Sequence, residues 1–281
     1  MDEEIASQIE AIELALIKDS FLGFDPAILS ILDDADVGQN EIENLKSKLG
    51  VDVFIYLFNI ANSAFHGSLK MGPAKYFFDV VNRLGMQHTK GLILQFVAHS
   101  MARKDPEAEI IFAKNFAASV VGRIMARGFG FRDDAARKVE LACLLSNIGA
   151  LLMTVYRNHC NTGDFVLSDD FIEQNKMYLT ERIIRRFQLP EYLLEMIMSN
   201  YFTLDRMGIG LPTVVRLAIA AVDWSFRTLD NKLVFRSPQT DRNDKFTPSL
   251  AAIIEEQFAA VGLTKYLIIL PEPTQVSGEA F

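Results

Sequence analysis

The stretch LFNIANSAFHGSLKMGPAKYFFDVVNRLG, residues 57–85, contains the pattern that decides the fold. Its first part continues a run of apolar residues at spacings of three and four, which predicts a helix over 52–62. The polar pair Asn62-Ser63 closes that helix, a loop follows, and a second helix is predicted over 73–84. Because polar side chains next to an aromatic cluster need hydrogen-bond partners, this pair either caps the helix and braces the loop or recognises a ligand or partner.

The same helical periodicity continues through the rest of the chain, and short alternating runs typical of strands are nearly absent. We therefore predict an all-α protein with two helical lobes, joined at the charged segment RKDPEAE, 103–109. The predicted organisation is an N-terminal helical lobe over 1–105, a second helical lobe over 106–235, and a polar loop, C-terminal helix and tail over 236–281. After three short helices with apolar stripes within 5–16, 28–32 and 42–49, further helices are predicted at approximately 87–102, 107–128, 132–157, 169–187, 190–201, 211–227 and 248–261.

Composition excludes several classes of function. Half of the 281 residues are hydrophobic, which is enough for a sizeable core, and the formal net charge is −8. An acidic chain is not attracted to nucleic acid, so no nucleic-acid partner is expected. The N-terminal residues lack the features of a secretory signal, and no uncharged apolar stretch reaches the roughly 20 residues that span a bilayer, so we expect a cytoplasmic protein without a membrane span. Cys143 and Cys160 have no zinc-like spacing, which predicts two reduced thiols.

A second informative stretch, LLSNIGALLM at 144–153, places Ser146 and Asn147 within a run that carries no charge from Leu141 to Tyr156. Packing alone would favour Leu or Ala at both positions. The pair therefore either caps or kinks a helix, or it occupies the place of a former or present site.

Residues 57–85 resemble the signature of HDOD domains, in which a Leu-x-x-Ala-Asn-Ser-Ala run is followed by a loop, a helix and Leu-Gly. The stretch FLGFDPAILSILDD at 21–34 resembles the proline-opened first helix of that family, and LLSNIGALLM resembles its Leu-Leu-His-Asp-Ile-Gly-x-Leu segment. The resemblance spans approximately residues 10–227. It implies a helical fold related to the HD metal-dependent phosphohydrolases, and signal transduction with response regulators or cyclic-dinucleotide enzymes as partners in trans. The matching signature residues are Ala61, Asn62, Ser63, Ala64, Leu84 and Gly85.

The resemblance also places each metal-ligand position of the HD enzymes on a neutral residue of this chain. Hydroxyl and amide groups cannot replace imidazole and carboxylate around a catalytic dication, so we predict no metal, no other cofactor and no catalytic residue. Asp223 lies one helical turn after Ile219 and is the candidate for a residual ligand. The neutral residues at the ligand positions are Asn115, Ser146, Asn147, Asn200 and Ile219.

A row of arginines is a further candidate for recognition. Arg182, Arg185 and Arg186 share one helical face, which is either a solvated surface or a docking site for an anionic nucleotide or an acidic partner. Phosphate-binding loops and nucleophile elbows are absent from the sequence.

We therefore predict a non-catalytic HDOD-type regulatory protein. It would bind a partner protein or a small-molecule signal in a groove between the helices near 52–100 and those near 112–223. One alternative is an HD-type phosphohydrolase or phosphodiesterase with relocated ligands such as Asp223. The other is a helical scaffold without a pocket.

Overall fold

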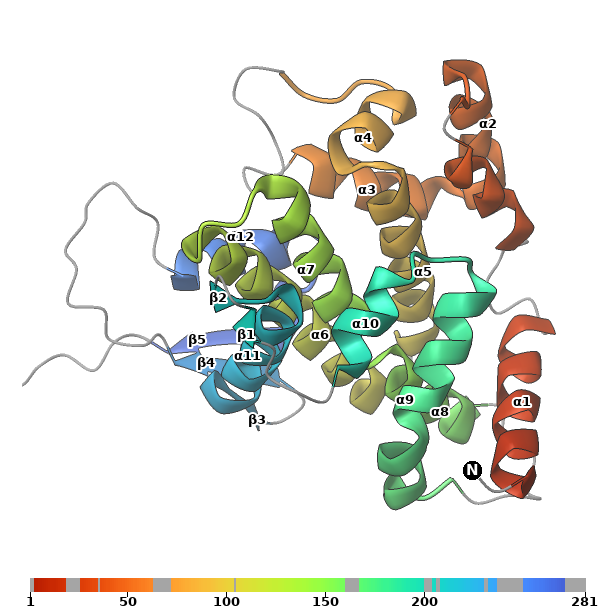
Figure 1. Cartoon of the computed structure of the whole chain (residues 1–281), viewed down its shortest axis with the longest axis vertical. Helices are drawn as coiled ribbons and strands as arrows, with labels where there is room; N and C mark the ends of the chain where they lie inside the picture. The colour runs from red at the N-terminus through yellow and green to blue at the C-terminus, as the bar shows by residue number, and fades with distance from the viewer. Residues whose placement is uncertain are drawn as a thin grey trace, which may run out of the picture.

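Helices form most of the elements, with bounds that follow the apolar periodicity of the sequence (Figure 1). The computed structural model describes residues 3–18, 26–34, 36–62, 72–103, 105–159, 167–199, 204–205, 208–229, 232–236 and 250–270. The α-helices are α1 Glu3–Lys18, α2 Gln39–Leu49, α3 Val51–Asn62, α4 Phe77–Leu84, α5 Met86–Ala102, α6 Pro106–Gly128, α7 Asp133–Leu145, α8 Ile148–His159, α9 Asp169–Arg186, α10 Tyr192–Met198, α11 Leu211–Ser225 and α12 Leu250–Ala260. Two 3-10 helices, η1 Pro26–Asp33 and η2 Thr264–Tyr266, complete the helical elements of the described residues.

Helix α5 is the central helix of the fold. Of its 17 residues, 14 are buried, so it is enclosed on all sides rather than amphipathic. It packs against η1, α3 and α4 on one side and against α6, α7 and α8 on the other (Figure 1). The buried hydrophobic cluster accordingly includes residues from Ile9 in α1 to Tyr266 in η2.

The helix predicted over 132–157 is interrupted, and this corrects the sequence prediction. The structure has two helices there, α7 and α8, with a turn at Ser146 and Asn147. The Ser146 hydroxyl donates to the carbonyl oxygen of Cys143 at 2.8 Å, and the Ser146 backbone N–H reaches the same oxygen at 3.3 Å. A hydroxyl that bonds a carbonyl three residues earlier competes with the helical ladder, which explains the break. The pair thus ends one helix and opens the next.

Helix α4 also begins later than predicted, at Phe77 instead of 73. The backbone N–H of Ala74 donates to Asn62 Oδ1 at 2.7 Å, and the N–H groups of Lys75 and Tyr76 donate to the Asp79 carboxylate. These side chains satisfy backbone donors outside the helix, and Tyr76 is extended at the N-cap position, so α4 begins at Phe77.

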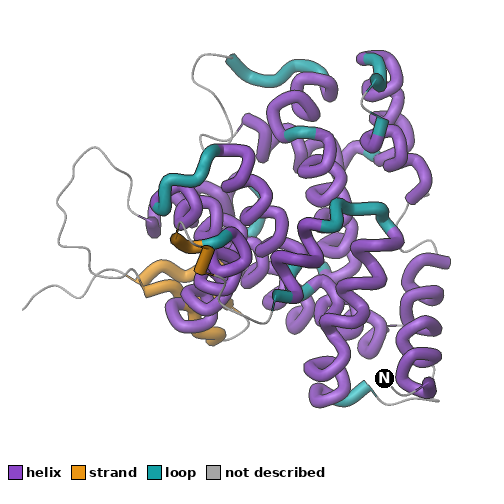
Figure 2. Tube along the Cα trace, viewed as in Figure 1, coloured by secondary structure: helices purple, strands orange, loops and turns teal. Residues whose placement is uncertain are grey.

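A small sheet is the feature that an all-helical prediction missed. Strands β3 Phe226–Leu229 and β4 Lys232–Arg236 form an antiparallel hairpin, and β5 Leu267–Leu270 joins β4 in parallel, with Leu233 opposite Leu267. The sheet lies at one side of the helical body (Figure 2), so the fold class remains helical. A further two-stranded ladder joins β1 Leu204–Asp205 to β2 Gly208–Ile209. The predicted polar loop from residue 237 and the tail from 271 lie outside the described residues.

Helices α7 and α8 together form one long apolar region of the chain. By length and composition, Asp133–His159, which comprises α7 and α8, could cross a bilayer. Because 89% of its apolar window is buried inside the protein, its side chains already form part of the core.

The predicted lobe boundaries at 105 and 235 stay a prediction.

Candidate functional site

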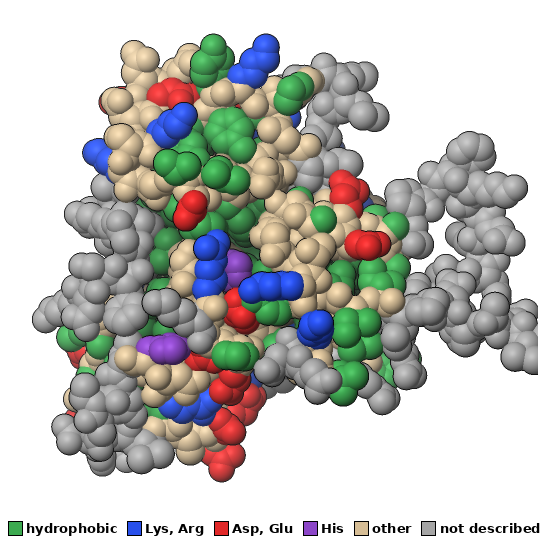
Figure 3. All heavy atoms as spheres, turned by 180° about the vertical axis from the view of Figure 1, so that it is seen from behind, with side chains coloured by type: hydrophobic (Ala, Val, Ile, Leu, Met, Phe, Trp, Pro, Cys, Tyr) green, Lys and Arg blue, Asp and Glu red, His purple; other side chains and the backbone are tan. Residues whose placement is uncertain are grey.

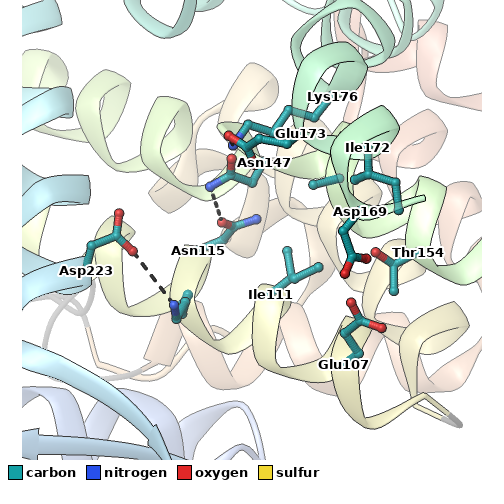
Figure 4. A pocket seen from close by; sticks show the side chains of 12 residues that line it. Glu107, Ile111, Asn115, Asn147, Thr154, Asp169, Ile172, Glu173, Lys176 and Asp223 are labelled. Atoms are coloured by element: carbon teal, nitrogen blue, oxygen red, sulfur yellow. Dashed lines mark hydrogen bonds and ion pairs between the residues drawn. The ribbon is translucent and has the colours of Figure 1, made fainter. Parts of the chain in front are cut away.

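A polar cavity of about 460 Å³ lies between α6, α8, α9 and α11. Helix α6 carries one wall, because Glu107, Ile111 and Asn115 recur at four-residue spacing on one of its faces. The N-cap of α6 is Asp105, whose side chain accepts from the backbone N–H groups of Glu107 and Ala108, and this fixes where the helix begins. The lining residues are Glu107, Ile111, Lys114, Asn115, Asn147, Ala150, Thr154, Asp169, Ile172, Glu173, Lys176 and Asp223 (Figure 4).

Two of the predicted ligand positions meet in this cavity. Asn147 Nδ2 donates to Asn115 Oδ1 at 3.3 Å, and both residues line the cavity. Asn115 is 2% exposed, and its own Nδ2 has no hydrogen-bond partner. The break between α7 and α8 positions Asn147 for this contact. The amide pair therefore leaves one buried donor unused.

Ser146 and Ile219, two further predicted ligand positions, do not line this cavity. Ser146 is buried, and its hydroxyl is bonded to Cys143 O rather than directed at Asn115. Ile219 is half-buried and packs against the hydrophobic core. Asn200 lies outside the described residues, as does Ser63 from the Asn-Ser pair.

Each carboxylate of the cavity is close to a basic side chain. Arg157 donates to both Glu107 and Asp169, and Lys176 pairs with Glu173 at 2.6 Å. Burial alone would lower the pKa of Arg157, but the hydrogen bonds with Asp169 and Glu107 raise it, so this guanidinium stays charged.

Asp223 makes a weaker pair. It lies 3.9 Å from Lys114, and the two side chains are 61% and 35% exposed. An ion pair this long and this exposed contributes little to stability. Both groups are therefore available to other partners.

The donor set does not fit the divalent metal of an HD enzyme. A dication of that kind needs several imidazole or carboxylate ligands around one point. Here two neutral amides bond each other, and Asp223 is close to Lys114. Among the described residues, no group of three or more His, Cys, Asp or Glu side chains could hold a metal ion.

The remaining sequence candidates have intramolecular partners. Asn62 Oδ1 accepts from Ala74 N and from Arg83 Nη1 at 3.1 Å, which braces the loop before α4. Arg182 and Arg186 approach Glu13 of α1, and Arg185 pairs with Glu181 and Glu191.

The two regions between which a groove is predicted, 52–100 and 112–223, meet at one small cavity among the described residues. Ile60 and Leu92 face Phe116 across a cavity of about 10 Å³, which has room for about one water molecule. A separate cavity, of about 460 Å³, is formed by residues between 107 and 223. The predicted groove stays a prediction.

Sequence reasoning did not single out Glu107, Asp169, Lys176 or the exposed side chain of Trp224. This single tryptophan of the chain is 88% exposed and follows Asp223 at the end of α11.

The back face of the molecule shows acidic side chains gathered at its lower end with basic ones beside them (Figure 3).

The order of the helices and the buried position of α5 define the class: a helical domain. The fold is similar to that of a proposed metal-dependent phosphohydrolase from Shewanella amazonensis SB2B, with a TM-score of 0.56 and 12% identity over 92% of this chain and 100% of that one. The chain belongs to the HDOD domain family, whose profile matches residues 26–201. The resemblance seen in residues 57–85 is thereby confirmed.

A second solved structure is an HDOD domain protein of unknown function from Geobacter sulfurreducens. It matches with a TM-score of 0.44 and 13% identity over 90% of this chain and 92% of that one. No curated protein matches the sequence.

Proposed function

We propose that this HDOD protein is a non-catalytic regulator that works by binding, with the cavity between α6, α8, α9 and α11 as its ligand site. The observation that carries the proposal is the hydrogen bond between Asn147 and Asn115, at positions where the related HD enzymes would have metal ligands. A neutral amide pair removes the charge that holds a dication but keeps hydrogen-bonding groups at the same place.

The pairing of the nearby carboxylates supports the same proposal. Glu107 and Asp169 share Arg157, and Glu173 is bonded to Lys176, so the negative charge at the cavity is largely neutralised within the protein. The volume of about 460 Å³ is within the range of small-molecule sites. Ligand binding would then be signalled through contact with a partner protein. The family resemblance implies response regulators and cyclic-dinucleotide enzymes as the classes of partner.

The experiment measures metal content and turnover together. Protein purified without chelator should contain substoichiometric manganese, iron, zinc and magnesium, and it should not hydrolyse bis-p-nitrophenyl phosphate above the rate of a buffer blank. The alternative, an HD-type phosphohydrolase with Asp223 as a relocated ligand, predicts stoichiometric metal and turnover that Asp223→Asn abolishes. The matched control is Asp170→Asn, an exposed carboxylate outside the cavity. Metal and turnover that respond to Asp223→Asn and not to the control would overturn the proposal.

A further inference from the structure

Helix α1 covers the arginines of α9 with a face that carries a single charge. Ile9, Ile12 and Leu16 recur on α1 at spacings of three and four, and each is at most 2% exposed. Glu13 lies within the same stripe and is 4% exposed. Burying a carboxylate is costly unless a cation pairs with it, so a helix that only filled space would have an apolar residue here. Glu13 therefore makes the docking of α1 specific for a basic surface.

Helix α9 supplies that basic surface. Arg182 Nε donates to Glu13 Oε2 at 2.5 Å, and Arg186 Nε lies 3.8 Å from Glu13 Oε1, so each carboxylate oxygen is close to a guanidinium. The Arg182 guanidinium also lies over the ring of Tyr178, one helical turn earlier, at 5.9 Å from the ring centroid. Tyr178, Arg182 and Arg186 thus form a receptor for one carboxylate, which we call the arginine face.

The arginine face does not depend on α1 for its solvation. With α1 in place, the side chains of Arg182 and Arg186 are still 29% and 47% exposed. All three charged groups regain water when α1 leaves, so the ion pairs add little net free energy to docking. Helix α1 packs against α8 and α9 at the edge of the molecule (Figure 1), and it precedes residues 26–201, which the HDOD profile matches. These are the features of a docked ligand more than of a core helix.

We propose that α1 is an intramolecular ligand of the arginine face, and that a partner protein displaces it with an amphipathic helix of the same pattern, one carboxylate within an apolar stripe. The arginines select the carboxylate, and the surfaces of α8 and α9 that α1 covers receive the apolar side chains. Helices α8 and α9 also line the cavity, so a partner bound here contacts two of its four helices. The inference rests on the proposed function and names the chemistry of its protein partner.

The test uses a fluorescein-labelled peptide with the sequence of residues 3–18 as the probe and the full chain as its receptor. In the unaltered chain α1 competes from within the same molecule, so the peptide should bind weakly. Glu13→Lys in the chain places a like charge against the arginines and releases α1, so fluorescence anisotropy should show peptide binding at least about tenfold tighter. The matched control, Glu10→Lys, changes an exposed carboxylate of α1 and should leave the peptide affinity unchanged.

Charge reversal assigns the binding to the arginine face. Arg182→Glu with Arg186→Glu repels Glu13 in the chain and in the peptide alike, so the peptide should not bind this double variant. A peptide that carries Glu13→Lys should bind the double variant and should not bind the Glu13→Lys chain. Circular dichroism verifies the fold of each variant. In the unaltered chain, hydrogen exchange should show the amides of α1 at least about tenfold less protected than those of α5, because α1 opens locally.

Four outcomes overturn the inference. They are equal peptide binding by the unaltered and Glu13→Lys chains, affinities that do not follow the charge reversal, equal protection of α1 and α5, and unfolding of the whole Glu13→Lys chain. A dimer of the unaltered chain that Glu13→Lys dissociates, measured by sedimentation, would assign the arginine face to α1 of a second copy and would overturn the role of a partner protein. None of these results affects the proposed absence of catalysis, which is decided separately by metal content and turnover.

Discussion

At the scale of single residues, His99 is held in its neutral form by its surroundings. It is 6% exposed, and its ring stacks on Phe112 with the centroids 4.1 Å apart. Burial, with added repulsion from Arg103 and Lys265, lowers the pKa of His99 from 6.5 to about 4. The folded protein therefore binds a proton at this group less readily than the unfolded chain does.

This difference predicts a pH dependence of stability. Between pH 6.5 and pH 4 the unfolded chain takes up a proton at His99 and the folded chain does not, so the free energy of unfolding should fall as the pH is lowered through that window. The contribution of a single group has a slope of at most about 1.4 kcal/mol per pH unit. Urea titrations across this range measure it.

The His99→Phe variant supplies the comparison. Phenylalanine keeps a ring against Phe112 but cannot take up a proton, so the variant should show a shallower pH dependence whatever its absolute stability. Identical slopes in the two proteins would contradict the assignment to His99.

The residues of the cavity differ in how readily the sequence indicates them. The family resemblance assigned both Asn115 and Asn147 to ligand positions of one metal site, so the sequence indicated that they lie close together. In the structure Asn147 Nδ2 is 3.3 Å from Asn115 Oδ1. Glu107 and Asp169 could not be identified, because each lies in the first turn of a helix. Acidic residues are common there for the sake of the helix dipole, and only the folded arrangement shows that these two share Arg157.

At the scale of elements, helices were predictable and strands were not. Apolar spacing is a local signal, and it placed α6 and α9 to within one residue at each end. The sheet depends on pairing between LVF at 233–235 and LII at 267–269, which are more than thirty residues apart. Runs of four or five apolar residues do not distinguish a strand from a helix end, so the prediction extended a helix to 227 where the structure ends α11 at Ser225.

The contact between α8 and α9 depends on the absence of a side chain at Gly149. Its backbone N–H donates to Thr180 Oγ1 at 3.0 Å. A Cβ atom at this position would clash with the carbonyl oxygen of Lys176 and would lie 2.9 Å from the backbone nitrogen of Thr180. Gly149→Ala should therefore separate the two helices and lower the free energy of unfolding by about 3 kcal/mol, as measured by chemical denaturation.

Gly128 provides the matched control for this prediction. It is the last residue of α6, and a Cβ atom there would meet nothing within 4 Å. Gly128→Ala should leave stability within about 1 kcal/mol of the unaltered protein, on the stabilising side, because alanine restricts the unfolded chain. Equal effects of the two substitutions would disprove a close contact at Gly149.

At the scale of the whole molecule, the enclosure of α5 joins the N-terminal helices to those around the cavity. Because 14 of its 17 residues are buried, neither side can unfold without exposing apolar surface of α5 to water. We expect heating, followed by circular dichroism at a helical wavelength, to show a single cooperative transition with equal calorimetric and van't Hoff enthalpies. Two separated transitions would instead indicate that the predicted lobes are independent units.

The position of Trp224 determines what intrinsic tryptophan fluorescence can measure in this protein. Because the only indole of the chain is 88% exposed, it is already solvated by water in the native state, and its emission will change little when the chain unfolds. The same fluorophore is adjacent in sequence to Asp223, at the rim of the cavity. Native fluorescence is therefore a poor measure of unfolding, but it can report binding at the neighbouring cavity that we propose as the ligand site.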